Sequence, residues 1–207
     1  MKFLNFRHLV VFGYIGIVIL LFFVLIVSNY YDLPLQKFTA DPTATLEAHP
    51  LTGLISNIGV LFWCATATIC LFSFTIISPK KGNKLSWFLL FSGLFSLILL
   101  ADDLFLLHEN ILPYKLNIHQ KLVYVGYAFT MSGYIFFFWK IILGFDYKYF
   151  IISILLFGAS IICDLFLPIV DWEYFLEDSL KIFGIFSWFL FYARTSQSIL
   201  LREITER

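Results

Sequence analysis

Long runs of hydrophobic residues alternate with short polar segments along the whole chain. A helix needs about 20 mostly apolar residues to cross the hydrocarbon core of a bilayer. Six runs reach roughly that length, at 9–28, 54–78, 85–107, 122–143, 149–170 and 175–193. In lipid the backbone must satisfy its own hydrogen bonds, which favours helices. The pattern therefore predicts an all-α integral membrane protein, in which six transmembrane helices form a compact bundle and a single domain over residues 1–207.

The composition supports this class. Of the 207 residues 60% are hydrophobic and only 14% are charged, whereas soluble domains carry about 25% charged residues. The formal net charge is zero, so we expect a lipid bilayer as the surroundings and no nucleic-acid partner. The three cysteines, Cys64, Cys70 and Cys163, lie within apolar runs and are interpreted as small apolar fillers.

The basic residues predict the orientation, because cytoplasmic segments of membrane proteins carry an excess of Lys and Arg. With the N-terminus inside, the cytoplasmic segments hold Lys2, Arg7, Lys80, Lys81, Lys84, Lys140, Lys148, Arg194, Arg202 and Arg207. The outer segments hold only Lys37, Lys115 and Lys121. We therefore expect both termini in the cytoplasm, and the protein in a bacterial-type plasma (inner) membrane.

The stretch LLADDLFLLHEN, residues 99–110, places four ionisable side chains at the outer end of the third run. At about 1.5 Å per residue, Asp102 lies roughly 25 Å above the cytoplasmic boundary. The same estimate puts Asp164 at about 22 Å, Lys181 at about 20 Å and Glu177 at about 25 Å. Charges are costly inside a bilayer, so we expect these groups to face one another or a cavity in the outer third of the membrane.

Helical spacing predicts which residues share a face. Asp102, Phe105, Leu106 and Glu109 share a face of the third helix, because positions i, i+3, i+4 and i+7 align. Glu177, Lys181, Gly184 and Trp188 align on the sixth helix, where Gly184 would allow another helix to approach closely.

Several pairings are open for the charged groups. Lys181 has Glu177 at i−4 and Asp178 at i−3, so both can form ion pairs within the helix. Asp164 needs a partner from another helix, and Asn57 and Lys181 are the candidates.

Histidine with carboxylates is a ligand set for Zn²⁺, Mn²⁺ or Fe²⁺. The first hypothesis is therefore an enzyme with one divalent metal that hydrolyses a lipid at the outer leaflet. Its metal ligands would come from Asp102, His108, Glu109, Asp164 and Glu177, and its catalytic groups would be Asp102, Glu177 and Lys181. A carboxylate would be the general base, and Lys181 would stabilise a developing anion.

Two further hypotheses account for the same residues. A proton or cation transporter or channel would use Asp102, Asp164, Glu177 and Lys181 as a relay, although nothing charged continues that path through the inner half of the spans. A non-catalytic membrane subunit or sensor would need only that the charges pair and fix the helix register.

Overall fold

The computed structural model describes residues 6–39, 42–49, 51–77, 84–166 and 171–205. These residues form helices joined by loops, with no strand among them. The chain divides into two compact units, Met1–Gly53 and Leu54–Arg207, and each is described by itself. Lys2, Lys80, Lys81 and Arg207, which contributed to the predicted orientation, lie outside the described residues. That orientation and the single domain over the whole chain stay predictions.

The first unit begins with α1 (Phe6–Tyr30), followed by the short helices α2 (Gln36–Thr39) and α3 (Pro42–Thr45). The chain turns after α1 at Asp32, which has a positive φ of 51°. The Ser28 hydroxyl donates a hydrogen bond to the Leu33 carbonyl at 2.6 Å and fixes this turn.

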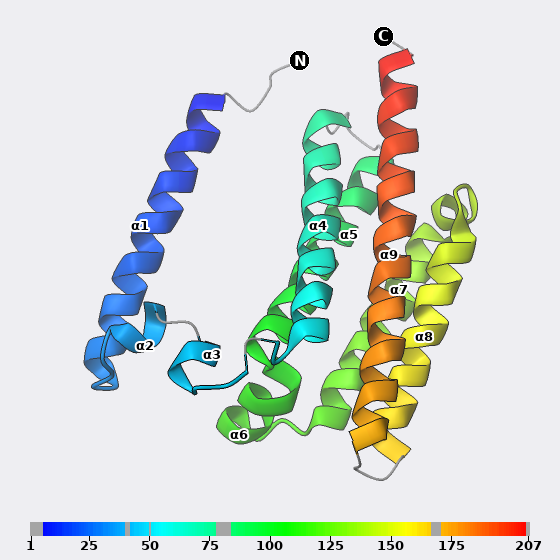
Figure 1. The fold of residues 1–207 in the computed structure, drawn as a ribbon. Coiled ribbons are helices and arrows are strands. Elements are labelled where there is room, and N and C mark those ends of the chain that lie inside the picture. The colour runs from blue at the N-terminus through cyan, green and yellow to red at the C-terminus, as the bar shows by residue number, and fades with distance from the viewer. Residues whose placement is uncertain (1–5, 40–41, 50, 78–83, 167–170, 206–207) are drawn as a thin grey trace. The chain divides into compact units, whose positions relative to one another are not determined.

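The second unit contains the long helices α4 (Leu54–Ile77), α5 (Lys84–Phe105), α7 (Gln120–Leu143), α8 (Tyr147–Phe166) and α9 (Asp171–Thr205) (Figure 1). The π-helix η1 (Leu107–Ile111) and the short helix α6 (Leu112–Leu116) connect α5 to α7. Helix α9 packs against both α4 and α8, and α4 packs against α5. Helix α7 is less tightly held, since Ile142 is its one buried residue.

Small residues allow the packed helices to approach closely. A Cβ at Gly93 on α5 would lie 2.7 Å from Leu71 Cγ on α4. A Cβ at Gly184 on α9 would lie 2.8 Å from Phe157 Cε1 on α8. Both distances are too short for a real contact, so the predicted role of Gly184 is confirmed.

Large aromatic side chains fill the space between these helices. Phe88 of α5 and Trp188, Phe191 and Tyr192 of α9 are completely or almost completely buried. The Tyr192 hydroxyl donates a hydrogen bond to the Tyr134 hydroxyl at 2.9 Å, which satisfies its polar end inside the bundle. This packing holds α9 at a fixed position against its neighbours and so positions the polar residues nearer its start.

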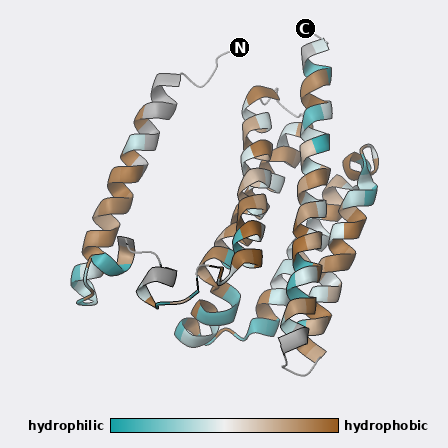
Figure 2. Cartoon of the chain, viewed as in Figure 1, coloured by the Kyte–Doolittle hydropathy of each residue, from teal (hydrophilic) through white to brown (hydrophobic). Residues whose placement is uncertain are grey.

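Four of the described helices, α4, α5, α7 and α8, are each long and apolar enough to cross a membrane, as expected for an integral membrane protein. Figure 2 shows hydrophobic residues along most of their length, with hydrophilic residues gathered near α6 and towards the end of α9. In α1 the apolar stretch Ile17–Tyr30 is shorter than a span. Helix α9 carries Glu177, Asp178 and Lys181 within its first half. Four helices therefore support the prediction of membrane spans, and the total of six spans stays a prediction.

Several predicted boundaries differ from the ends of the helices, among them the starts of α1 at Phe6 and of α9 at Asp171, which were expected at residues 9 and 175. The third apolar run was expected to remain helical to residue 107, but α5 ends at Phe105. The sixth was expected to end at residue 193, but α9 continues to Thr205. The predicted end of the fifth run, residues 167–170, lies outside the described residues.

Candidate functional site

The chain reverses sharply where α5 ends. Leu106 has φ 51° and ψ 46°, a left-handed conformation that is costly for a residue with a side chain. The next residues form the π-helix η1, a feature that is frequent at functional sites. The prediction that Asp102 and Glu109 share a face of one continuous helix is therefore wrong, because the left-handed residue interrupts that helix.

The reversal brings His108 onto Asp102. The His108 backbone N–H donates a hydrogen bond to Asp102 Oδ1 at 2.9 Å. The imidazole Nδ1 lies 2.7 Å from the other carboxylate oxygen, Oδ2. Both residues are buried, with 3% of Asp102 and 6% of His108 exposed. One carboxylate thus fixes both the backbone and the ring of the histidine.

The second ring nitrogen of His108 faces a different acid. Its Nε2 lies 3.5 Å from Glu109 Oε1, and the Glu109 side chain is about half exposed. Burial disfavours the charged imidazole, but the charge of Asp102 and then that of Glu109 outweigh it, so the pKa of His108 is raised above its usual value. Folding therefore shifts the equilibrium of His108 towards its protonated form.

Asp103 joins three helices. Its Oδ1 lies 2.8 Å from Lys181 Nζ on α9, and its Oδ2 accepts a hydrogen bond from Trp63 Nε1 on α4 at 2.8 Å. The adjacent aspartates of α5 therefore have separate partners, since Asp102 holds His108 and Asp103 holds Lys181. Lys181 forms its close ion pair with Asp103 on another helix. The sequence had offered Glu177 and Asp178, on its own helix, as partners.

Asp164 connects α8 to α7. Its Oδ2 accepts hydrogen bonds from the Tyr124 hydroxyl at 2.8 Å and from Gln120 Nε2 at 3.1 Å. The prediction that Asn57 or Lys181 is the partner of Asp164 is therefore wrong. The sequence missed Tyr124 because a tyrosine among apolar residues also fits a membrane-interface position.

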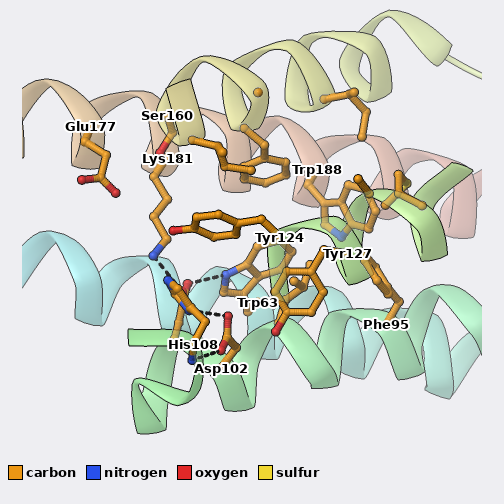
Figure 3. A pocket seen from close by; sticks show the side chains of 18 residues that line it. Trp63, Phe95, Asp102, His108, Tyr124, Tyr127, Ser160, Glu177, Lys181 and Trp188 are labelled. Carbon is orange, nitrogen blue, oxygen red and sulfur yellow. Dashed lines mark hydrogen bonds and ion pairs between the residues drawn. The ribbon is translucent and has the colours of Figure 1, made fainter. Parts of the chain in front are cut away.

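A cavity of about 260 Å³ lies among α4, α5, α7, α8 and α9 (Figure 3). Asp102, His108, Glu177 and Lys181 line one end of this cavity in the close-up, and Asp103, also on the lining, pairs with Lys181. Phe95 and Trp188 lie towards the other end, as the close-up shows.

The cavity accounts for four of the six residues predicted for the site. Asp102, His108, Glu177 and Lys181 are all on its lining. Asp164 reaches it only through Tyr124, which is a lining residue. Glu109 contacts His108 from the other side of the ring.

Sequence reasoning did not select Trp63, Tyr124 or Tyr127, which are aromatic residues of the lining that carry a polar atom. The two tyrosines are three residues apart, so they lie on the same face of α7. This spacing is the feature of the sequence that could have indicated that the two tyrosines act together. Nothing local to Trp63 marked it, because its partner Asp103 is 40 residues away.

The described residues give no support to the predicted metal centre. Among the residues that the structure describes, no group of three or more His, Cys, Asp or Glu side chains is placed to hold a metal ion. Asp102 and Glu109 face different ring nitrogens of His108, so they lie on different sides of the imidazole. Asp164 is engaged with Tyr124 and Gln120. The Zn²⁺, Mn²⁺ or Fe²⁺ cofactor therefore stays a prediction.

Comparison with known proteins gives one match. The model of a family described as a domain of unknown function (DUF8692) matches residues 13–195. No curated protein and no solved structure matches the chain.

Proposed function

The chain belongs to the DUF8692 family, and from the geometry of its cavity we propose that it binds a lipid or similar amphiphile of the outer leaflet and hydrolyses it with the Asp102–His108 pair. The proposal includes six membrane spans with both termini in the cytoplasm. That topology places the polar end of the cavity in the outer third of the bilayer.

The observation that carries this proposal is the division of one cavity into a charged end and an aromatic end. Ligand sites are typically apolar clefts with a few placed polar groups. A lipid has the same division, with a polar head group and an apolar chain. Burial of Asp102 and His108 at the charged end is costly without a use or a partner, and a perturbed histidine in a cleft is a recognised indicator of function.

The Asp102–His108 pair supports proton transfer at a head group. His108 Nδ1 lies 2.7 Å from Asp102 Oδ2, whereas Nε2 lies 3.5 Å from the half-exposed carboxylate of Glu109. We assign the proton exchange to Nε2, because its acid is more distant and more exposed. Neutral His108 would accept a proton from water as that water attacks an ester or amide carbonyl, and protonated His108 would then donate to the leaving group. Lys181 lines the same end of the cavity and would stabilise the negative charge that develops on the carbonyl oxygen.

Lipid hydrolysis by purified protein tests this function. Wild type in nanodiscs made from a total polar lipid extract should release fatty acids or lysolipids, detected by mass spectrometry. His108→Gln and Asp102→Asn should release at least about 100-fold less, which is the usual contribution of a general base. Asp146→Asn is the matched control, because Asp146 is an exposed acid that pairs with Arg194 away from the cavity. Equal release by all four proteins would refute the role of the pair.

The metal-assisted version has its own test. Elemental analysis by mass spectrometry would compare wild type with Glu177→Gln and Asp102→Asn. One stoichiometric transition metal that both substitutions remove would support it. No bound metal, together with His108-dependent hydrolysis, would support the metal-free version.

A proton pathway is the second candidate, and buried hydroxyls favour it. Ser86, Thr195 and Ser196 are each 1% exposed, and their side-chain oxygens have no hydrogen-bond partner among the described residues. Buried polar atoms of this kind usually bind ordered water. Such water would continue a path from the acids through the inner half of the bundle. A pH jump across proteoliposomes with an internal pH dye would detect flux, and flux without lipid hydrolysis would favour this candidate. Neither flux nor hydrolysis would favour the non-catalytic subunit.

A further inference from the structure

Every acidic or basic side chain that lines the cavity has an interaction partner. Lys181 Nζ lies 2.8 Å from Asp103 Oδ1, and His108 Nδ1 lies 2.7 Å from Asp102 Oδ2. Glu177 also has an interaction partner. A charged ligand would lose its hydration here without meeting an uncompensated opposite charge, which is unfavourable. We propose that the substrate is a fatty ester or amide with an uncharged head group and a single acyl chain, an inference that rests on the proposed function and names its substrate class.

The two basic groups of the lining are not available to a phosphate. Asp103 lies against Lys181 and is fixed there, because its Oδ2 accepts a hydrogen bond from Trp63 Nε1 at 2.8 Å. Asp102 is fixed against His108 by a second bond, in which the His108 backbone N–H donates to Oδ1 at 2.9 Å. A phosphate would have to displace an acid that two interactions hold in place. The lining therefore selects against an anionic head group.

The two aspartates are equally occupied with respect to an ammonium group. Asp102 has the His108 backbone N–H at Oδ1 and the His108 ring at Oδ2. Asp103 has the Lys181 ammonium at Oδ1 and the Trp63 indole at Oδ2. All four carboxylate oxygens thus already face a nitrogen of the protein. An ammonium would have to compete with these fixed nitrogens, so the lining also selects against a cationic head group.

An uncharged head group finds suitable partners on the same lining. Tyr127 and Ser160 line the cavity, and a hydroxyl can both donate and accept a hydrogen bond. These groups suit the hydroxyls and carbonyl of an uncharged ester or amide. In the reaction, the oxygen of one water molecule bonds to the carbonyl carbon, and the bond from that carbon to the ester oxygen or amide nitrogen breaks. His108 passes one proton from the water to the leaving group, so the products are a fatty acid and an alcohol or amine.

The cavity volume favours one acyl chain. An apolar cavity of about 150 Å³ binds benzene, which has six carbon atoms, so about 260 Å³ accommodates roughly ten non-hydrogen atoms. The glycerol and the ester carbonyl of a monoacylglycerol take up about eight of these, which leaves the aromatic end for the first carbons of the chain. A second ester carbonyl would fill that space with polar atoms. The sparse packing of α7, whose one buried residue is Ile142, gives the rest of one chain a route into the bilayer.

Four esters with the same acyl chain test this inference on full-length protein in dodecyl maltoside micelles. Monolauroylglycerol is uncharged, lauroylcholine carries a cation, lauroyl lysophosphatidate carries an anion, and dilauroylglycerol has a second chain. The release of lauric acid, corrected for the rate without protein, gives kcat/KM for each ester. Monolauroylglycerol should have a kcat/KM at least about tenfold higher than each of the other three, because specificity is the ratio of these values.

One substitution tests whether paired charges are the source of the selectivity. Asp103→Asn removes the acid that compensates Lys181 and keeps the size of the side chain. It should raise the kcat/KM of lauroyl lysophosphatidate relative to monolauroylglycerol by at least about tenfold, because the Lys181 charge can then attract the phosphate. Asp146→Asn is the matched control, since it removes an acid from the exposed pair with Arg194 and should leave that ratio unchanged. The wild-type comparison needs no variant, so the inference stays testable if Asp103→Asn does not fold.

Analogues without an ester separate binding from hydrolysis. The dodecyl ether of glycerol, dodecyl phosphate and dodecylamine have the same chain length and different head groups. Trp63 and Trp188 line the cavity, so tryptophan fluorescence reports binding. The glycerol ether should bind most tightly.

The possible results distinguish this inference from the function on which it rests. Equal or faster hydrolysis of a charged ester would overturn the uncharged head group, and equal hydrolysis of dilauroylglycerol would overturn the single chain. Both results leave lipid hydrolysis in place. Preferential binding of the glycerol ether without hydrolysis of any ester would overturn the proposed hydrolysis and support the class of ligand. Neither binding nor hydrolysis would overturn both.

Discussion

Removal of one charge from the Asp103–Lys181 pair should destabilise the protein far more than removal of one charge from Asp146–Arg194. The first pair joins α5 to α9, with side-chain exposures of 9% for Asp103 and 29% for Lys181. The second pair has side-chain exposures of 50% for Asp146 and 59% for Arg194. Both pairs link a carboxylate to a cation on α9, so the comparison of the two pairs measures chiefly the effect of burial.

The expected magnitudes follow from that burial. Breaking a buried ion pair on one side costs about 3–5 kcal/mol, because the remaining charge is left without compensation. Partial exposure of Lys181 lets water reach one partner, so for Lys181→Met we expect the lower end, about 3 kcal/mol. An exposed pair contributes about 0.2–1 kcal/mol, so Arg194→Gln should cost about 0.5 kcal/mol.

A double-mutant cycle measures the coupling in each pair. Asp103→Asn combined with Lys181→Met leaves neither charge, so the double variant should regain about 2 kcal/mol relative to the sum of the single variants. The coupling energy between Asp146→Asn and Arg194→Gln should be below about 0.5 kcal/mol.

Reversible unfolding in mixed dodecyl maltoside and SDS micelles, followed by tryptophan fluorescence, gives the free energies of unfolding for the cycle. The reasoning is refuted if the two pairs show equal coupling. It is also refuted if the double variant at the buried pair loses as much free energy of unfolding as its two single variants combined.

Four further predictions concern His108, Gly184, Gly133 and Tyr124. The raised pKa of His108 stabilises the folded protein below its usual pKa of about 6.5. That stabilisation should disappear as the pH rises from there through the raised value, and a pH series of melting temperatures should lose this slope in His108→Gln. Gly184→Ala places its Cβ 2.8 Å from a ring on α8 and should cost about 1–3 kcal/mol. Gly133→Ala, which meets nothing within 4 Å, should stabilise its helix by roughly 0.5–1 kcal/mol in the same unfolding assay. Tyr124→Phe should cost about 1 kcal/mol, since it removes a hydrogen bond to a carboxylate that keeps a second donor. Combining it with Asp164→Asn should add little further loss.

The positions of the apolar helices could be predicted because the signal is local. A run of about 20 apolar residues is visible without knowledge of any other part of the chain. The start of α4 at Leu54 and the end of α7 at Leu143 match the predicted boundaries. The boundary after Asp103 was wrong because nothing in the run LFLLHEN signals a left-handed residue, and Leu106 is an unusual residue in that conformation.

The composition of the site could also be anticipated, but its pairing could not. Helical rise alone places Asp102, Glu177 and Lys181 near one depth, and the structure puts all three on one cavity. Depth does not give the rotation of each helix about its axis or the order of helices in the bundle. The link between Asp164 and Tyr124 depends on both.

The sequence by itself determined that this chain forms long apolar helices and that Asp102, Glu177 and Lys181 lie near one depth along them. Hydrophobic burial and backbone hydrogen bonding act over one helix at a time, so their consequences can be read along the chain. Only the tertiary structure decided that Asp102 holds His108 while Asp103 holds Lys181 and Trp63. Those choices depend on distances of a few ångströms between helices, and packing of side chains such as Phe157 against Gly184 sets these distances.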